Sequence, residues 1–205
     1  MPQQRGPGLS LAEWLVLCLA SERPVHGFAI ASLLAEDGSL GRVWHVRKAV
    51  VYRAAQRLEE LGLIVASGKQ PSSLGPARVQ LQATPEGRRA AEEWLRQPAD
   101  HARDIRSELL LKMALLDRAG ADPGDLLRAQ RSQLAPIADA LAGQIPATTG
   151  FDQVLLQWRH ESVSSTLRFL DARLATVPAP RQNAPSRGFF HRVGHFFSRL
   201  FGAEQ

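Results

Sequence analysis

The chain has very little cysteine and no long apolar segment. Its 205 residues include one cysteine, Cys18. A single cysteine excludes an intramolecular disulfide framework and leaves no CxxC pair for a zinc site. No segment approaches the roughly 20 apolar residues that a membrane-spanning helix needs. We therefore expect a cytoplasmic protein whose thiol stays reduced.

The sequence also lacks the motifs of common catalytic sites. It has no glycine-rich phosphate loop, and the glycines of a nucleophile elbow are missing around Ser164 and Ser165. His160-Glu161 is not part of an HExxH motif, and the six histidines are scattered. We therefore expect neither an enzyme nor a resident metal or other cofactor.

The composition is that of a folded protein with an excess of positive charge. Hydrophobic residues make up 44% and charged residues 22%, which argues against a wholly disordered chain. The formal net charge is +5, with the excess in residues 1–100 and 181–205 and a balanced middle. This charge is compatible with nucleic acid or an anionic membrane surface as a partner.

The first half of the chain has the element order of a winged helix-turn-helix. Apolar spacing, turn residues and capping signals predict three helices, a β-hairpin with a long tip and a fourth helix. Thr84 and Pro85 are the expected cap and first residue of that last helix. The predicted ranges are 9–20, 25–36 and 47–61 for the three helices, 63–65 and 78–82 for the strands, and 84–96 for the fourth helix.

The second half is predicted to be helical. We expect helices over 105–118, 125–143 and 151–176, with a kink or break at Pro136. The last helix has two apolar stripes about 130° apart, so it must pack on two sides. One side suits its own domain and the other a partner subunit. The stripes are Phe151, Leu155, Trp158 and Phe169, and Val163, Leu167, Leu170 and Leu174.

The expected fold is mainly α with a small β-hairpin wing. We assign residues 9–97 to a winged helix-turn-helix domain and 103–176 to an α-helical dimerisation region. Three prolines mark 177–188 as a linker. Residues 189–205 form an amphipathic segment with five phenylalanines, which suits docking on the protein's own dimer, a protein partner or an anionic membrane surface.

The third predicted helix has the two faces that a DNA-recognition helix needs. Its apolar face is directed toward the domain, whereas basic residues cluster on the other face near its beginning, and Glu59 and Glu60 come late. The alternative is an ordinary solvated face. The candidate DNA contacts are Arg47, Lys48, Tyr52, Arg53, Gln56 and Arg57 on this helix, and Lys69, Ser72, Ser73 and Arg78 at the hairpin tip.

Five segments carry a family resemblance. They are 24–28 (PVHGF), Tyr52 with 57–64 (RLEELGLI), 75–78 (GPAR), 81–91 (LQATPEGRRAA) and 107–112 (SELLLK). In this order they resemble motifs of the PadR-like transcriptional regulators, over about residues 9–118. That family often has Gly-Ser/Thr before its Leu-Tyr, where this chain has Ala49 and Val50, so one small hydroxyl is missing.

The resemblance implies a DNA-binding transcriptional regulator, expected to be a repressor. It also implies a homodimer formed by the C-terminal helices, with an effector pocket at the interface in some members. Trp94 and Trp158 are candidates for stacking on a planar effector, and the alternative is that both fill the core or an interface. The rival function is a protein–protein adaptor whose winged domain no longer binds DNA.

Overall fold

The computed structural model describes residues 8–70 and 78–176. These residues form two compact units. The first unit, here called the winged-helix unit, contains residues 8–70, 78–95 and 110–121, and the second, the helical unit, contains 96–109 and 122–176. The expectations for Ser72 and Ser73, the linker 177–188 and the segment 189–205 fall outside the described residues. The predicted domains 9–97 and 103–176 stay a prediction. The compact units of the structure divide the chain differently, with residues 110–121 in the winged-helix unit.

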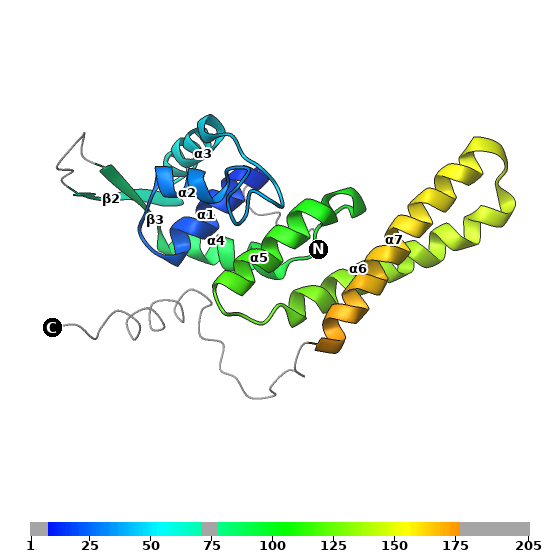
Figure 1. The fold of residues 1–205 in the computed structure, drawn as a ribbon. Coiled ribbons are helices and arrows are strands. Elements are labelled where there is room, and N and C mark those ends of the chain that lie inside the picture. The colour runs from blue at the N-terminus through cyan, green and yellow to red at the C-terminus, as the bar shows by residue number, and fades with distance from the viewer. Residues whose placement is uncertain (1–7, 71–77, 177–205) are drawn as a thin grey trace. The chain divides into compact units, whose positions relative to one another are not determined.

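The winged-helix unit contains five α-helices and three strands among its described residues (Figure 1). The helices are α1 (Leu11–Glu22), α2 (Gly27–Leu33), α3 (Lys48–Glu60), α4 (Pro85–Arg96) and α5 (Leu110–Arg118), and the strands are β1 (Val25–His26), β2 (Ile64–Gln70) and β3 (Arg78–Ala83). The expected order of three helices, hairpin and helix is therefore confirmed.

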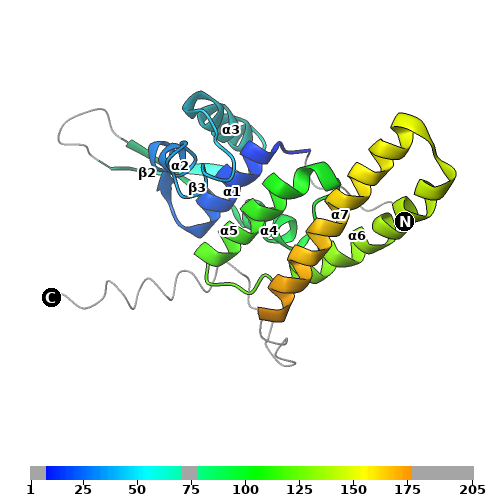
Figure 2. The same cartoon turned by 45° about the vertical axis from the view of Figure 1, so that its right-hand side comes forward.

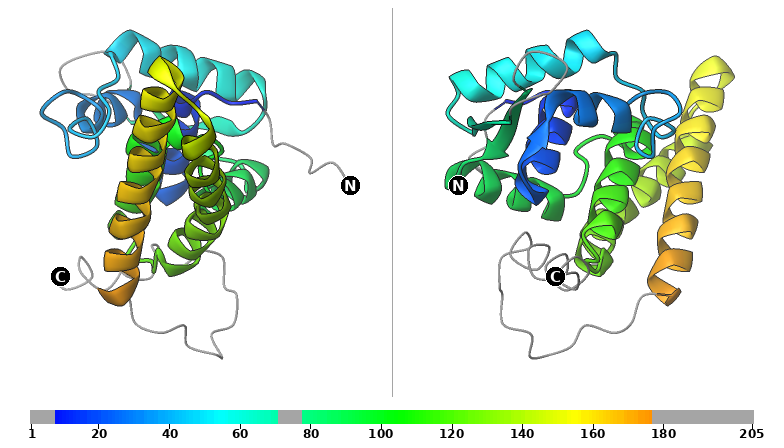
Figure 3. Two further views of the ribbon diagram at one scale, coloured as in Figure 1. Left: turned by 90° about the vertical axis from the view of Figure 1, so that its right-hand side faces the viewer. Right: turned by 60° about the vertical axis from the view of Figure 1, so that its left-hand side comes forward.

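Helix α1 is the central element of this unit. It lies between α3 on one side and α4 on the other (Figures 1 and 3), and residues 15–21 are all buried. Its beginning is fixed by a capping box: the amide of Ser10 donates to the Glu13 carboxylate at 2.6 Å, and the amide of Glu13 donates to the Ser10 hydroxyl at 3.4 Å. The cap that the sequence indicates at Ser10 is therefore present.

The sheet has one more strand than the sequence predicts. Its antiparallel order is β1-β3-β2, with Val25 opposite Leu81 and Ile64 opposite Ala83. The sequence predicts a helix at residues 25–26, but they pair with β3 before α2 begins. Two residues are too short for any periodicity, so only pairing with a distant segment defines this strand. The ring of His26 adds a 3.2 Å contact from Nδ1 to the Val79 carbonyl oxygen.

The start of the hairpin and the start of α4 are held together through Thr84. Helix α3 ends at Glu60, and Gly62 follows two residues later with a φ of 69°, the left-handed conformation that glycine adopts readily. The Thr84 hydroxyl donates to the Gly62 carbonyl at 3.0 Å and accepts from the Gly87 amide at 3.0 Å. A Cβ on Gly87 would lie 2.0 Å from the Leu63 carbonyl oxygen. Only glycine allows α4 to approach the hairpin this closely.

An aromatic stack joins α1, α4 and α5. The rings of Trp14 and Trp94 are parallel within 7°, with centroids 5.3 Å apart. The Lys112 ammonium lies 4.4 Å from the Trp94 centroid, and Lys112 is 1% exposed. A second link joins α5 to α1, because the Arg118 guanidinium donates to both carboxylate oxygens of Glu22 at 2.9 and 3.2 Å. These contacts explain why α5 belongs to the winged-helix unit, although its sequence suggests the C-terminal region.

The helical unit is built on two long antiparallel helices that lie side by side (Figures 1 and 2). These are α6 (Gly124–Gln144) and α7 (Gly150–Thr176), joined by a short 3₁₀ turn at Ile145–Ala147. Two further turns precede them in sequence, at Ala102–Asp104 and Ile105–Leu109. Helix α6 continues through Pro136. The break that the sequence predicts there as one of two alternatives, on the ground that proline removes a helical hydrogen bond, is therefore absent.

The two stripes of α7 have different surroundings. Val163 and Leu170 are buried. By contrast, Phe151 is 77% and Trp158 71% exposed, and Phe169 is 39% exposed. One stripe therefore covers the interior of the helical unit, and the other is open to solvent in the single chain.

The close approach at Gly87 predicts a large loss of stability on substitution. In Gly87→Ala the new methyl would meet the Leu63 backbone, and forced overpacking costs about 1–3 kcal/mol. Thermal unfolding should show a Tm lower by roughly 4 °C or more. In the matched variant Gly143→Ala, in α6, no atom lies within 4 Å of the new Cβ, so Tm should stay or rise. Equal Tm values for both variants would contradict this account of Gly87.

Candidate nucleic-acid interface

Helix α3 buries one face and exposes the other. Val51, Ala54 and Leu58 are buried among the helices of the unit, with Ala55 beside them. Val50 is half-buried and Leu61 is 38% exposed, so the apolar face is narrower than the sequence predicts. Figure 3 shows α3 along the outside of the unit, away from α4. Its polar face is therefore accessible over the whole helix.

All six candidates from the third helix lie on the exposed surface of α3. They are Arg47, Lys48, Tyr52, Arg53, Gln56 and Arg57. The last two interact with the acidic end of the helix: Gln56 donates to Glu60 at 3.3 Å, and Arg57 lies 3.6 Å from the same carboxylate. Among the described residues, no ion pair involves Arg47 or Arg53. The positive charge is therefore concentrated toward the N-terminal half of α3.

The beginning of α3 has no side-chain cap. Arg47 is the N-cap residue, and its side chain makes no capping hydrogen bond. The first amides of a helix have no partner within the helix, and together with the helix dipole they favour an anion. A basic residue in place of a capping side chain strengthens that preference. This end of α3 is therefore suited to a phosphate oxygen.

Tyr52 lies against the beginning of α2. A Cβ on Gly27 would be 3.0 Å from Cε1 of the Tyr52 ring, and the tyrosine is still 45% exposed. The glycine in the PVHGF segment thus allows α2 and α3 to meet closely. Tyr52 is both part of the helix contact and part of the exposed face.

The hairpin places two more candidates at its far end. Lys69 is the penultimate residue of β2 and Arg78 the first residue of β3, and the backbone pairs Lys69 with Val79 and Gln70 with Arg78. The register shifts between Ser67 and Lys69, as at a β-bulge. Both basic residues therefore belong to the hairpin's distal end, as the sequence predicts.

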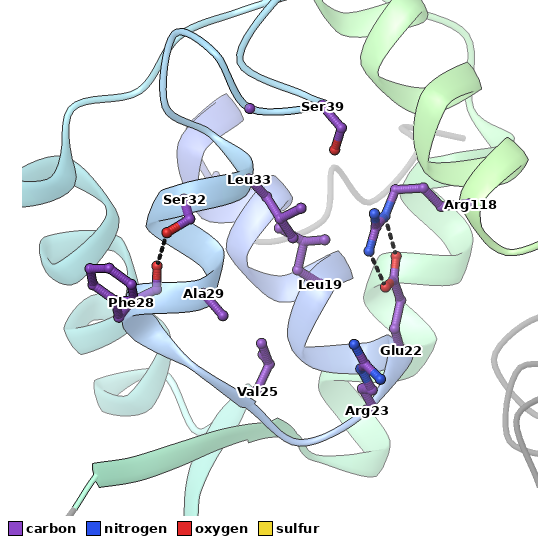
Figure 4. Close-up of a pocket in the computed structure, with 11 residues that line it drawn as sticks. Leu19, Glu22, Arg23, Val25, Phe28, Ala29, Ser32, Leu33, Ser39 and Arg118 are labelled. Carbon is purple, nitrogen blue, oxygen red and sulfur yellow. Dashed lines mark hydrogen bonds and ion pairs between the residues drawn. The ribbon is translucent and has the colours of Figure 1, made fainter. Parts of the chain in front are cut away.

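A surface pocket of about 540 Å³ lies among α1, α2 and α5 (Figure 4). Its wall is mainly apolar, with the Glu22–Arg118 ion pair at one side. Neither effector candidate lines it. Trp94 is 6% exposed, with Trp14 and Lys112 against its ring, whereas Trp158 is exposed on α7 in the other unit. The apolar lining residues are Leu19, Val25, Phe28, Ala29 and Leu33.

Within 8–70 and 78–176, no cluster of three His, Cys, Asp or Glu side chains could hold a metal ion. Cys18 is buried, and burial raises the pKa of its thiol far above the ordinary value, with the Glu22 carboxylate adding to the rise and Lys112 opposing it. In the same ranges no helix has the length and apolar character to cross a bilayer.

The comparison with protein families gives the same assignment as the motifs. Residues 16–93 match the sequence model of the transcriptional regulator PadR-like family. This part of the chain is similar to the PadR-like family. The match extends from within α1 to within α4, so it includes α3 and the hairpin, and the resemblance seen in the sequence is confirmed there. The family's description is that of a transcriptional regulator and not of an enzyme.

The chain is also similar to a solved structure. The crystal structure of Bacillus subtilis PadR in complex with operator DNA is similar, with 17% identity and a TM-score of 0.42. The alignment covers 81% of this chain and 98% of that one. No curated protein matches the chain.

The environment of Cys18 predicts an unreactive thiol. A thiolate is the reactive form, and burial of Cys18 strongly disfavours it in the PadR-like unit. A thiol-specific chromogenic reagent should therefore give no rapid signal with the native protein and one thiol per chain in denaturant. A full rapid signal without denaturant would contradict the buried position.

Proposed function

We propose that this protein is a sequence-specific, DNA-binding transcriptional regulator of the cytoplasm that acts as a homodimeric repressor. One observation carries the proposal: a PadR-like winged-helix unit exposes the basic, N-terminal half of α3 while burying the opposite face of that helix. Such a two-faced helix fits the major groove, where side chains near the N-terminus of a recognition helix reach base edges.

The charge distribution along α3 sets the direction of approach. Positive charge near the uncapped N-terminus comes from Arg47, Lys48 and Arg53. At the other end of α3, the charge of Arg57 is offset by its ion pair with Glu60. The N-terminal half therefore points toward the phosphates and the groove. Lys69 and Arg78 at the end of the hairpin suit the flanking backbone or the minor groove, contacts that position a protein rather than specify sequence.

The exposed stripe of α7 supports the proposed homodimer. Phe151, Val154 and Trp158 are each more than half exposed and lie on successive turns. A contiguous apolar surface of this kind is typical of an interface. A second copy of the chain is the occupant that we propose, because a dimer would give two α3 helices for two major grooves about 34–36 Å apart.

Regulation by a small molecule is part of the proposal. An effector can change DNA affinity only through different affinities for two states of the dimer. Trp158, on the stripe proposed as the dimer interface, remains available for stacking on a planar molecule. Trp94 is a weaker candidate, because a tryptophan and a lysine already lie against its ring.

Removing single charges from α3 should weaken DNA binding without unfolding the protein. Lys48 and Arg53 are exposed, so Lys48→Ala and Arg53→Ala should keep the wild-type Tm. Removal of a phosphate contact should lower the log–log salt slope by about 0.9, and removal of a base contact should cost about 1–3 kcal/mol of binding free energy. Fluorescence anisotropy on DNA from upstream of the gene, against random DNA, measures both effects.

Arg89→Ala is the matched control for charge. Arg89 is exposed on α4, a helix that lies on the other side of α1 from α3, so its removal changes net charge equally but should leave the salt slope unchanged. Wild-type affinity in both α3 variants would contradict the recognition face. No DNA binding by the wild type at low salt would instead favour the adaptor function.

The proposed dimer should depend on the exposed apolar stripe of α7. A double variant, Phe151→Ser with Trp158→Ser, removes two exposed aromatic side chains. The proposed dimer should then dissociate while the helical content stays unchanged. Sedimentation velocity at micromolar concentration measures this. Arg168→Ser, on a different face of α7, is the control and should remain dimeric. A monomeric wild type would exclude the two-groove arrangement.

A further inference from the structure

Lys48, the first residue of α3, lies near two aromatic rings. Its ammonium nitrogen is 5.2 Å from the centroid of Phe28 and 5.9 Å from the centroid of Tyr52. Both distances are within the roughly 6 Å at which a cation is attracted to an aromatic face. Tyr52 is one turn further along α3, whereas Phe28 comes from the first turn of α2. The lysine is therefore held by both helices of the helix-turn-helix.

Phe28 is mainly exposed, and it also lines the surface pocket beside α1. It is 61% exposed, the second residue of α2, and its ring lies near the Lys48 ammonium of the recognition face. Its hydroxyl-free ring offers no hydrogen bond to a phosphate. Its contact with the Lys48 ammonium is the polar interaction that the structure gives this side chain.

A lysine held in this way differs from a freely moving surface lysine. The long side chain of lysine normally loses much rotamer freedom when its ammonium is fixed by a ligand. Two rings that already restrict the chain reduce that loss. The ammonium keeps donors for a further acceptor, and the acceptor that suits lysine in the major groove is the N7 and O6 edge of guanine.

We propose that Phe28 is a specificity-determining residue of this protein: it positions Lys48, together with Tyr52, to read a guanine in the major groove. This inference rests on the proposed DNA binding. It assigns to Phe28 an action through Lys48 rather than a DNA contact of its own. It also separates Lys48, a reader of base sequence, from Arg47 and Arg53, which suit phosphate.

The experiment is a selection of duplexes from a randomised library by the full-length protein, followed by anisotropy on the selected duplex and on single-base variants. Wild type should select guanine at one position of each half-site. Lys48→Met should lose that preference. Phe28→Leu should weaken it and lower affinity by about two- to fivefold, the range for an exposed cation–π contact. Phe28→Tyr, which keeps an aromatic face, should restore both.

A double variant tests whether Phe28 acts through Lys48. Phe28→Leu should have no further effect on affinity in the Lys48→Met protein, because the cation is then absent. Leu61→Ala, which shortens an exposed apolar side chain just after α3, is the matched control and should keep the guanine preference. Since Phe28 is mainly exposed, wild-type Tm in Phe28→Leu is the folding control.

Three results would overturn the inference. One is a uniform drop in affinity in Phe28→Leu with the guanine preference intact, and another is an equal drop in the Lys48→Met background. The third is selection of guanine by Lys48→Met as strongly as by wild type. If wild type selects no sequence at all, the proposed function itself fails, which is a result distinct from these three.

Discussion

The winged-helix unit depends on the burial of α1. A run of seven residues in the middle and end of this helix is inaccessible to solvent, so other elements must cover it on every side. Helix α3 covers one side, and the Trp14–Trp94 stack fixes α4 on another. The buried ammonium of Lys112 against Trp94 then attaches α5. Burying a charged group is costly unless other groups interact with it, so this contact helps to make the position of α5 specific.

This arrangement leaves the outer face of α3 free for another molecule. Because small side chains such as Ala54 and Ala55 are part of the buried face of α3, the helix can pack closely on the rest of the unit with only a narrow apolar stripe. The remaining circumference carries basic residues and Tyr52 in its N-terminal half and Glu59 and Glu60 at its end. Gly27 has the same effect at the contact with α2, since it allows the Tyr52 ring to approach. An aromatic ring from each of the two helices thereby lies within about 6 Å of the Lys48 ammonium.

In the helical unit, one apolar stripe of α7 is covered and the other is exposed. Helix α7 has two apolar stripes but only one covered face within the chain, which leaves large aromatic side chains in solvent. Its covered face is joined to α6 by apolar contacts and by the Arg131–Asp171 ion pair at 2.5 Å. In the proposed dimer the exposed stripe packs against a second copy of the chain. One stripe of α7 would then pack inside its own helical unit, and the other would form the dimer interface. The distance between the two recognition helices would then follow from this interface.

Local signals determined much of this protein from the sequence alone. The capping box at Ser10, the glycine after α3, the cap at Thr84 and the two faces of α3 all depend on residues within a turn or two of each other. Other features required distant segments to meet. Strand β1 exists because β3 pairs with it, and α5 joins the winged-helix unit because Lys112 reaches Trp94. Phe28 lies beside Lys48 for the same reason. Periodicity and capping reflect neighbours along the chain, whereas only tertiary structure decides which surfaces far apart in sequence come together.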